Sequence, residues 1–178
     1  MGMNDMVKFD RQRLIFGLYL LVVIAAFELL VGHFKVPGWP AFLAMIFFFV
    51  EHMDLKKASH IIVGGVFGIA LILLARPIIG ALAPIMGLEL AGLTFVLVLV
   101  YAIVAFGEMV PILFNNYAFM YLTVTGVAVQ QPNPNPFLWM AIAAVGGSAL
   151  IAGVVGIGRL MMAQAAAKAA TASTTSSA

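Results

Sequence analysis

Apolar residues in this chain form long runs that are separated by short polar or proline-containing breaks. A helix needs about 20 mostly apolar residues to cross a bilayer, and most of the runs are close to that length. The pattern therefore predicts an all-α, polytopic membrane protein with six transmembrane helices. Their expected ranges are 13–32, 39–50, 58–75, 90–107, 111–129 and 137–162.

The second and fifth of these helices are expected to be short or broken. The segment 39–50 reaches the polar stretch at Glu51 after about a dozen apolar residues, so it either crosses a thinned bilayer or is re-entrant. The fifth opens on Pro111 with a polar first turn. The segment 77–88 is apolar but contains two prolines and two glycines, which predicts an interfacial connection, and the proline-rich 130–136 predicts a solvent loop.

Two stretches of the chain are near copies of each other. Val63–Ala70 (VGGVFGIA) and Val145–Ala152 (VGGSALIA) share five of eight residues, and a Val-Pro pair precedes each copy, at Val36-Pro37 and Val110-Pro111. Three helices per half would place the halves in opposite orientations, as in the inverted repeats of many transporters. The sequence predicts a 3+3 inverted repeat.

The repeat sets the expected domain organisation. A six-helix membrane domain spans 13–163, with repeat halves at about 13–76 and 89–163. A cytoplasmic head at 1–12 and a flexible tail at 164–178, rich in Ala, Ser and Thr, complete the chain.

Composition supports a membrane location and excludes several other classes of protein. Hydrophobic residues make up 64% of the chain and charged residues only 9%, with a mean hydropathy of +1.13. The chain has no cysteine, which excludes disulfides and thiolate metal sites. The net charge is +2, but the basic residues flank apolar runs, so we expect them to orient the helices and to bind no nucleic acid.

The positions of the basic residues predict that both termini are cytoplasmic. If all six helices cross, two basic residues, Lys35 and Arg76, lie outside. The others share the cytoplasmic side: Lys8, Arg11, Arg13, Lys56, Lys57, Arg159 and Lys168.

Ionisable groups inside apolar runs are the first candidates for function, because they are costly in a bilayer. Glu28 and Glu108 occupy nearly matching places in the two halves, each after an Ala-Phe pair, and could hold a proton or a cation. Simple solvation at the headgroup level is the alternative for both.

The most polar cluster within any apolar segment is Asn115-Asn116-Tyr117. Two amides at the start of a helix offer donors and acceptors to a small polar solute. The alternative is that Asn115 caps the helix or bonds a neighbouring helix.

His60 stands one helical turn before Gly64 and could gate the protein or relay protons, although an interfacial histidine is the simpler interpretation. The preceding cluster, Glu51 to Asp54, has the residue types of a metal site but not a specific spacing, so we expect a solvated membrane edge, no metal and no cofactor. Gly64 and Gly68 lie four residues apart and predict close helix packing.

Three motifs resemble those of a family of small bacterial inner-membrane proteins of unknown function. They are the stretch Val36–Phe42 (VPGWPAF), the pair Gly64-Gly65, and Val110–Phe114 (VPILF), which opens the fifth helix. The resemblance covers about residues 14–160 and implies a bacterial inner-membrane location and this topology, but no substrate.

Two functions remain open. The first is a small-solute channel or secondary transporter, expected to be a homo-oligomer, whose path is lined by Glu108, Asn115 and Asn116, with Glu28 as counterpart. The second is a non-transporting scaffold that docks a partner or further copies of itself through its glycine faces. An enzyme is not expected, because no set of acid, base and nucleophile is present.

Overall fold

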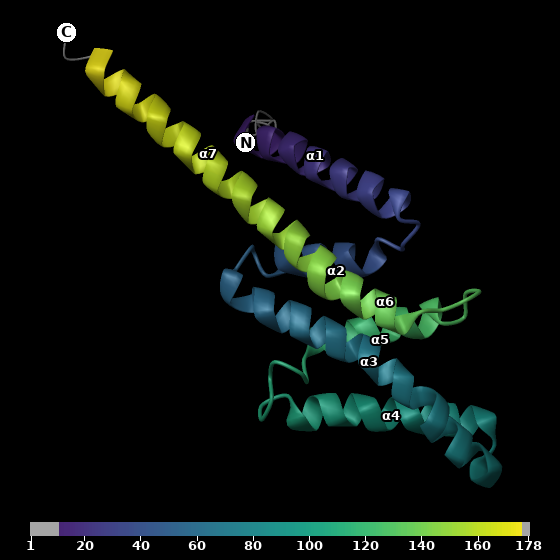
Figure 1. Cartoon of the computed structure of the whole chain (residues 1–178). Coiled ribbons are helices and arrows are strands. Elements are labelled where there is room, and N and C mark those ends of the chain that lie inside the picture. Colours follow the sequence, from purple (N-terminus) through teal and green to yellow (C-terminus); the bar gives the residue numbers. More distant parts are fainter. Residues whose placement is uncertain (1–10, 176–178) are drawn as a thin grey trace, which may run out of the picture. The chain divides into compact units, whose positions relative to one another are not determined.

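The computed structural model describes the backbone of residues 11–175 and the side chains of residues 11–167. Throughout this range the regular elements are helices, which confirms the all-α prediction. They are α1 (Arg11–His33), α2 (Trp39–Val50), α3 (Leu55–Met86), α4 (Leu88–Phe106), α5 (Asn116–Ala128) and α6 (Pro136–Ala141), after which the π-helical segment η1 (Ile142–Gly146) and α7 (Gly147–Thr175) follow without a break (Figure 1).

Four helical stretches are long and apolar enough to cross a membrane: α1, α3, α4, and the continuous helix 136–167 formed by α6, η1 and the first part of α7. The prediction that the second and fifth helices are short is confirmed. With 12 and 13 residues, α2 and α5 are only about 18 Å and 20 Å long.

The prediction that helix 3 stops before Pro77 is wrong. α3 continues through Pro77 and Pro84 to Met86, where Gly87 ends it with a φ of 85° and donates its N–H to Ala83 O at 2.9 Å. Each proline removes one backbone hydrogen bond. In an apolar segment, leaving the helix would expose many more unpaired backbone groups, so the helix persists.

The expected bounds of the last two helices also require correction. α5 begins at Asn116 instead of Pro111, because Asn115 has an extended φ of −147° and caps the helix through its side chain. The last helix continues beyond 162 to Thr175, through a segment whose alanines favour a helix. Most of the predicted head, 1–10, and the final residues 176–178 lie outside the described range.

The chain divides into two compact units. In the first, built from residues up to Lys35 and from Ala152 onward, α1 packs on α7. A Cβ atom at Gly153 would lie 3.0 Å from Cγ1 of Val23. The second unit, Val36–Ile151, contains α2 to α6, η1 and the first residues of α7.

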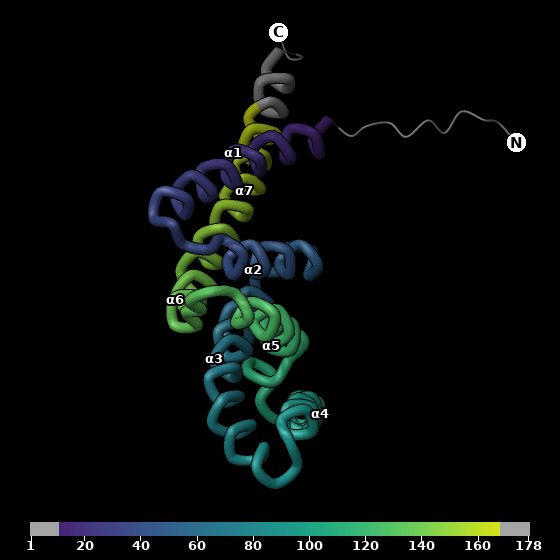
Figure 2. The backbone as a smooth tube through the Cα atoms, turned by 90° about the vertical axis from the view of Figure 1, so that its right-hand side faces the viewer, coloured from purple at the N-terminus to yellow at the C-terminus, as the bar shows by residue number. Residues whose placement is uncertain are grey.

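Within the second unit, α3 provides two packing surfaces. Its first half lies along α5, and its second half lies beside α4, as both views show (Figures 1 and 2). Thr94 of α4 donates to the Met86 sulfur at 3.6 Å. One cluster of its buried core consists of Ile69, Tyr121, Ala128, Trp139 and Ala143.

Candidate functional site

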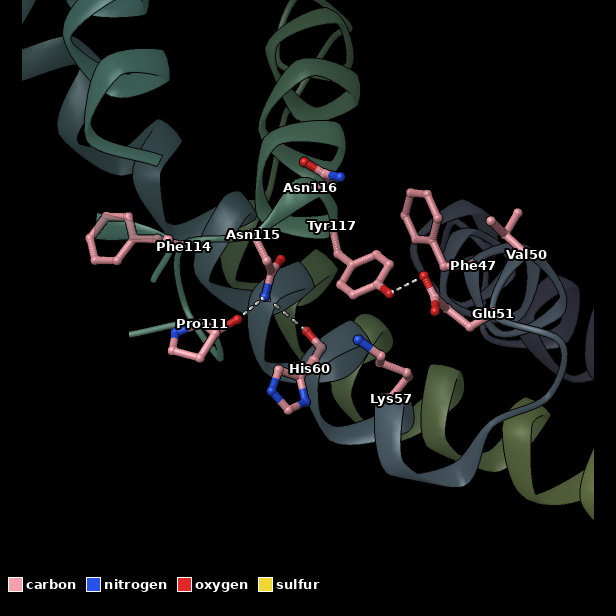
Figure 3. Close-up of a pocket in the computed structure, with 11 residues that line it drawn as sticks. Phe47, Val50, Glu51, Lys57, His60, Pro111, Phe114, Asn115, Asn116 and Tyr117 are labelled. Atoms are coloured by element: carbon pink, nitrogen blue, oxygen red, sulfur yellow. Dashed lines mark hydrogen bonds between the residues drawn. The ribbon is translucent and has the colours of Figure 1, made fainter. Parts of the chain in front are cut away.

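A cavity of about 440 Å³ lies where the end of α2, the start of α3, the α4–α5 connection and the start of α5 meet (Figure 3). Its lining residues are Phe47, Val50, Glu51, Lys57, His60, Gly107, Pro111, Phe114, Asn115, Asn116 and Tyr117. The wall therefore combines apolar and aromatic side chains with a few polar groups, which is the usual composition of a small-molecule site.

Asn115 uses both ends of its amide to hold the cavity wall together. Its Oδ1 accepts a hydrogen bond from Ala118 N at 2.9 Å, which caps α5. Its Nδ2 donates to Pro111 O at 2.9 Å, to Ile112 O at 3.1 Å and, more weakly, to His60 O at 3.5 Å. Asn115 thus fixes the α4–α5 connection and ties it to α3.

A second polar contact joins α2 to α5. Tyr117 Oη donates to Glu51 Oε1 at 2.6 Å, and the ring of Phe47 lies 5.3 Å from the Tyr117 ring (Figure 3). Glu51 follows the last residue of α2, and the two residues after it, His52 and Met53, have positive φ values of 53° and 62°. This tight turn connects α2 to α3.

Three polar side chains of the lining are left for a ligand. In the described part of the chain, the Asn116 amide and the Lys57 ammonium form no hydrogen bond or ion pair, and the His60 ring has only a 3.4 Å contact between Nδ1 and Ser59 Oγ. Figure 3 shows the Lys57 ammonium directed toward the centre of the cavity.

Glycines on α3 bring α5 close enough to form the cavity. A Cβ atom at Gly64 would lie 2.5 Å from Oδ1 of Asn115, and one at Gly65 would lie 2.6 Å from the Tyr121 ring. At Gly68 it would collide with the backbone carbonyl of Ala118. The close packing expected from Gly64 and Gly68 is confirmed.

Aromatic side chains fill the bundle between the cavity and the opposite end of α2. Phe47 lies at the cavity and its ring centroid is 6.1 Å from that of Tyr121, whose hydroxyl donates to Pro40 O at 2.6 Å. At the start of α2, Trp39 makes an edge-to-face contact with Trp139 of α6, with ring centroids 5.6 Å apart. Trp139 is buried.

The structure brings four of the six candidate site residues together: His60, Asn115, Asn116 and Tyr117 all line the cavity. Glu108 is exposed in the turn after α4, beside the lining residue Gly107, and is not itself part of the lining. Glu28 is exposed on α1, which belongs to the other compact unit.

Two charged lining residues, Glu51 and Lys57, did not emerge as site candidates from the sequence, where they are part of a polar cluster between two helices. The sequence gives little sign that they belong to a site, because the contact that brings Glu51 there joins it to Tyr117, 66 residues further along the chain. Within residues 11–175, no group of three His, Asp or Glu side chains is arranged to hold a metal ion.

The resemblance to small bacterial inner-membrane proteins stays a prediction. No protein-family model, no curated protein and no solved structure matches the chain.

Proposed function

We propose that the protein is a membrane channel or secondary transporter for a small polar or ionic solute, which binds in the cavity around Asn116 and Lys57. The observation that carries this proposal is the position of the cavity between the two sequence halves. Phe47, Glu51 and Lys57 come from the first half, and Pro111, Asn116 and Tyr117 from the second. Inverted-repeat transporters bind their substrates at such an interface.

Reciprocal glycine packing supports the inverted repeat. Gly65 and Gly147 hold the same place in the two copies of the Val-Gly-Gly motif. A Cβ at Gly65 would meet Tyr121 of α5, and one at Gly147 would lie 2.9 Å from Cβ of Ala44 on α2. Each motif thus packs on the short helix of the other half.

The first helix of each half also packs on a helix of the other half. α4 packs on the end of α3, where Thr94 contacts Met86, and α1 packs on α7, where Val23 lies against Gly153. In both cases a first helix lies against the third helix of the other half.

The topology that goes with this proposal has six membrane crossings and both termini in the cytoplasm, in a bacterial inner membrane. The short helices α2 and α5 would cross inside the bundle, sheltered by α3 and the continuous α6–η1–α7 helix. The cavity, at the end of α2 and the start of α3, would then open to the cytoplasm.

The aromatic residues beyond the cavity would form the closed gate of the path. Trp39 and Trp139 make their edge-to-face contact at the start of α2, away from the cavity at its end, and Tyr121 and Phe47 lie between. A solute could leave on that side only if the tryptophan pair separates, which is the change that alternating access requires.

Uptake into liposomes tests the proposal. Purified protein in liposomes should admit at least one small labelled solute faster than protein-free liposomes do. Val50→Trp, which adds bulk at the cavity wall, should slow that uptake at least tenfold, whereas Ile46→Trp, one turn earlier on the same exposed face of α2 but outside the cavity lining, should not. Uptake that is equal with and without protein, or unaffected by Val50→Trp, would overturn the proposal.

A non-transporting scaffold, active as a homo-oligomer, is the second candidate. The observation that favours it is that Asn115 and the glycines Gly64, Gly65 and Gly68 are fully used in packing. Under this alternative Val50→Trp has no effect on any flux, while the oligomeric state measured in detergent depends on exposed helix faces.

A further inference from the structure

Resting on the proposed function, we infer that the cavity selects small monocarboxylate anions. The inference comes from the balance of charge and hydrogen-bond donors around the cavity, and from the apolar wall that faces them. It concerns which class of solute the site accepts.

The ionic groups of the lining favour an anion. Glu51 is the one carboxylate among the lining residues, and it already accepts the short hydrogen bond from Tyr117. Lys57 has no ion pair with Glu51 or with any other residue of the described chain, and its ammonium is directed into the cavity (Figure 3). A cation would meet an unpaired ammonium there, whereas a carboxylate would neutralise it.

Hydrogen-bond donors surround the same space. The Asn116 amide offers two N–H groups, and the His60 ring offers one or two. The first N–H groups of a helix have no partner within the helix. In α5, the side chain of Asn115 accepts a hydrogen bond from the backbone N–H of Ala118. The backbone N–H groups of Asn116 and Tyr117, which line the cavity, are therefore available to a ligand that accepts hydrogen bonds.

The apolar side of the lining limits the size and charge of the anion. Phe47, Val50 and Phe114 face the polar groups and suit a short hydrocarbon or aromatic body. One ammonium beside one carboxylate leaves no second cation for a dianion. A solute with one carboxylate and a small apolar body fits these constraints best.

Binding and uptake are measured separately, so that this inference and the proposed function can fail independently. The anions are lactate and mandelate, and the comparison solutes are choline, a cation, and glycerol, a neutral molecule. Titration calorimetry on the purified full chain measures binding, and liposome uptake of labelled solutes measures transport. We expect lactate or mandelate to bind at least tenfold more tightly than choline and glycerol.

Variants at two neighbouring lysines locate the anion site. Lys57→Gln should weaken anion binding at least tenfold and Lys57→Arg should preserve most of it, because arginine keeps the charge. Lys56→Gln removes the same charge from an exposed residue outside the lining and should have no effect. Thermal unfolding of each variant checks that folding is intact.

The outcomes separate the two claims. Anion binding that depends on Lys57, without uptake of any solute, would support the anion site and contradict transport. Uptake of choline or glycerol that Val50→Trp blocks, without anion binding, would support transport and overturn the anion site. Anion binding that is equal in Lys57→Gln and the unmodified protein would also overturn it.

Discussion

Gly64 on α3 lies directly against the side chain of Asn115, the N-cap of α5: a methyl group at Gly64 would sit 2.5 Å from Oδ1 and 2.7 Å from Nδ2 of Asn115. The glycine makes room for the cap, and the cap fixes where α5 begins. Because Asn115 also bonds Pro111 and Ile112, this one contact positions the α4–α5 connection that forms one wall of the cavity.

Gly64→Ala should therefore destabilise the protein. The added methyl group has no free space, and forcing atoms into a packed site typically costs about 1–3 kcal/mol. Gly80→Ala, also on α3, is the matched control, because no atom lies within 4 Å of its Cβ position and alanine favours a helix. Thermal unfolding in detergent compares the two, and equal melting temperatures for Gly64→Ala and the unmodified protein would contradict the packing described here.

The adjacent asparagines should separate stability from solute binding. Asn115→Ala removes the N-cap and should lower stability by about 1 kcal/mol or more, since caps contribute about 0.5–2 kcal/mol. Asn116→Ala removes an amide that forms no hydrogen bond in the described chain, so it should leave the melting temperature nearly unchanged and reduce solute affinity. A reversed pattern, with Asn116→Ala unstable and Asn115→Ala impaired only in binding, would mean that their roles are exchanged.

Thr125 should be replaceable with a gain in stability. Its side chain is fully buried on α5, and its Oγ1 has no hydrogen-bond partner in the described chain. An unpaired buried polar atom costs about 1–3 kcal/mol, and valine has a similar shape without the hydroxyl. We expect Thr125→Val to raise the melting temperature, with Thr123→Val, whose hydroxyl is exposed and bonds Phe119 O at 2.9 Å, as the control. A lower melting temperature for Thr125→Val would show that the hydroxyl has a partner.

The tryptophan pair should control passage through the bundle. Trp39→Ala removes one ring of the Trp39–Trp139 contact and should turn slow, saturable uptake into a faster leak. Trp39→Cys with Trp139→Cys, joined by a thiol cross-linker, should stop transport until the cross-link is cleaved, and the chain has no native cysteine to interfere. Unchanged uptake after complete cross-linking would rule out this contact as the gate.

Several features of the fold follow directly from local sequence signals. Pro40 in the first turn of α2 and the prolines at 132–136 marked a helix start and a loop that the structure contains. The end of α3 does not follow from Pro77, because leaving the helix in an apolar segment would leave more backbone groups unpaired than the proline itself does. Proline therefore marks a helix end here where the neighbouring residues are polar, but not inside the apolar segment of α3.

The candidate site was only partly visible in the sequence. Asn115, Asn116 and Tyr117 stand out because polar residues are rare in apolar runs. Lys57 and Glu51 do not, because charges between two helices are usual, and only the folding of 111–117 against α2 and α3 makes them part of a cavity. Which of the two asparagines is structural could not be read from their adjacent positions either, because it depends on where α5 begins.

The sidedness of three loops tests the central claim, that the short helices cross and place the cavity between two inverted halves. Single variants Lys35→Cys, Lys56→Cys and Asn133→Cys are labelled with an impermeant thiol reagent in intact bacteria and again after lysis; all three residues are exposed. The account predicts that Lys35→Cys and Asn133→Cys react from outside and Lys56→Cys only after lysis. If Lys35→Cys and Lys56→Cys react from the same side, α2 does not cross. If Lys56→Cys and Asn133→Cys react from the same side, α3, α4 and α5 do not all cross, and the short α5 is the helix that fails to do so if the two long helices span. Either result would contradict the inverted repeat and the path built on it.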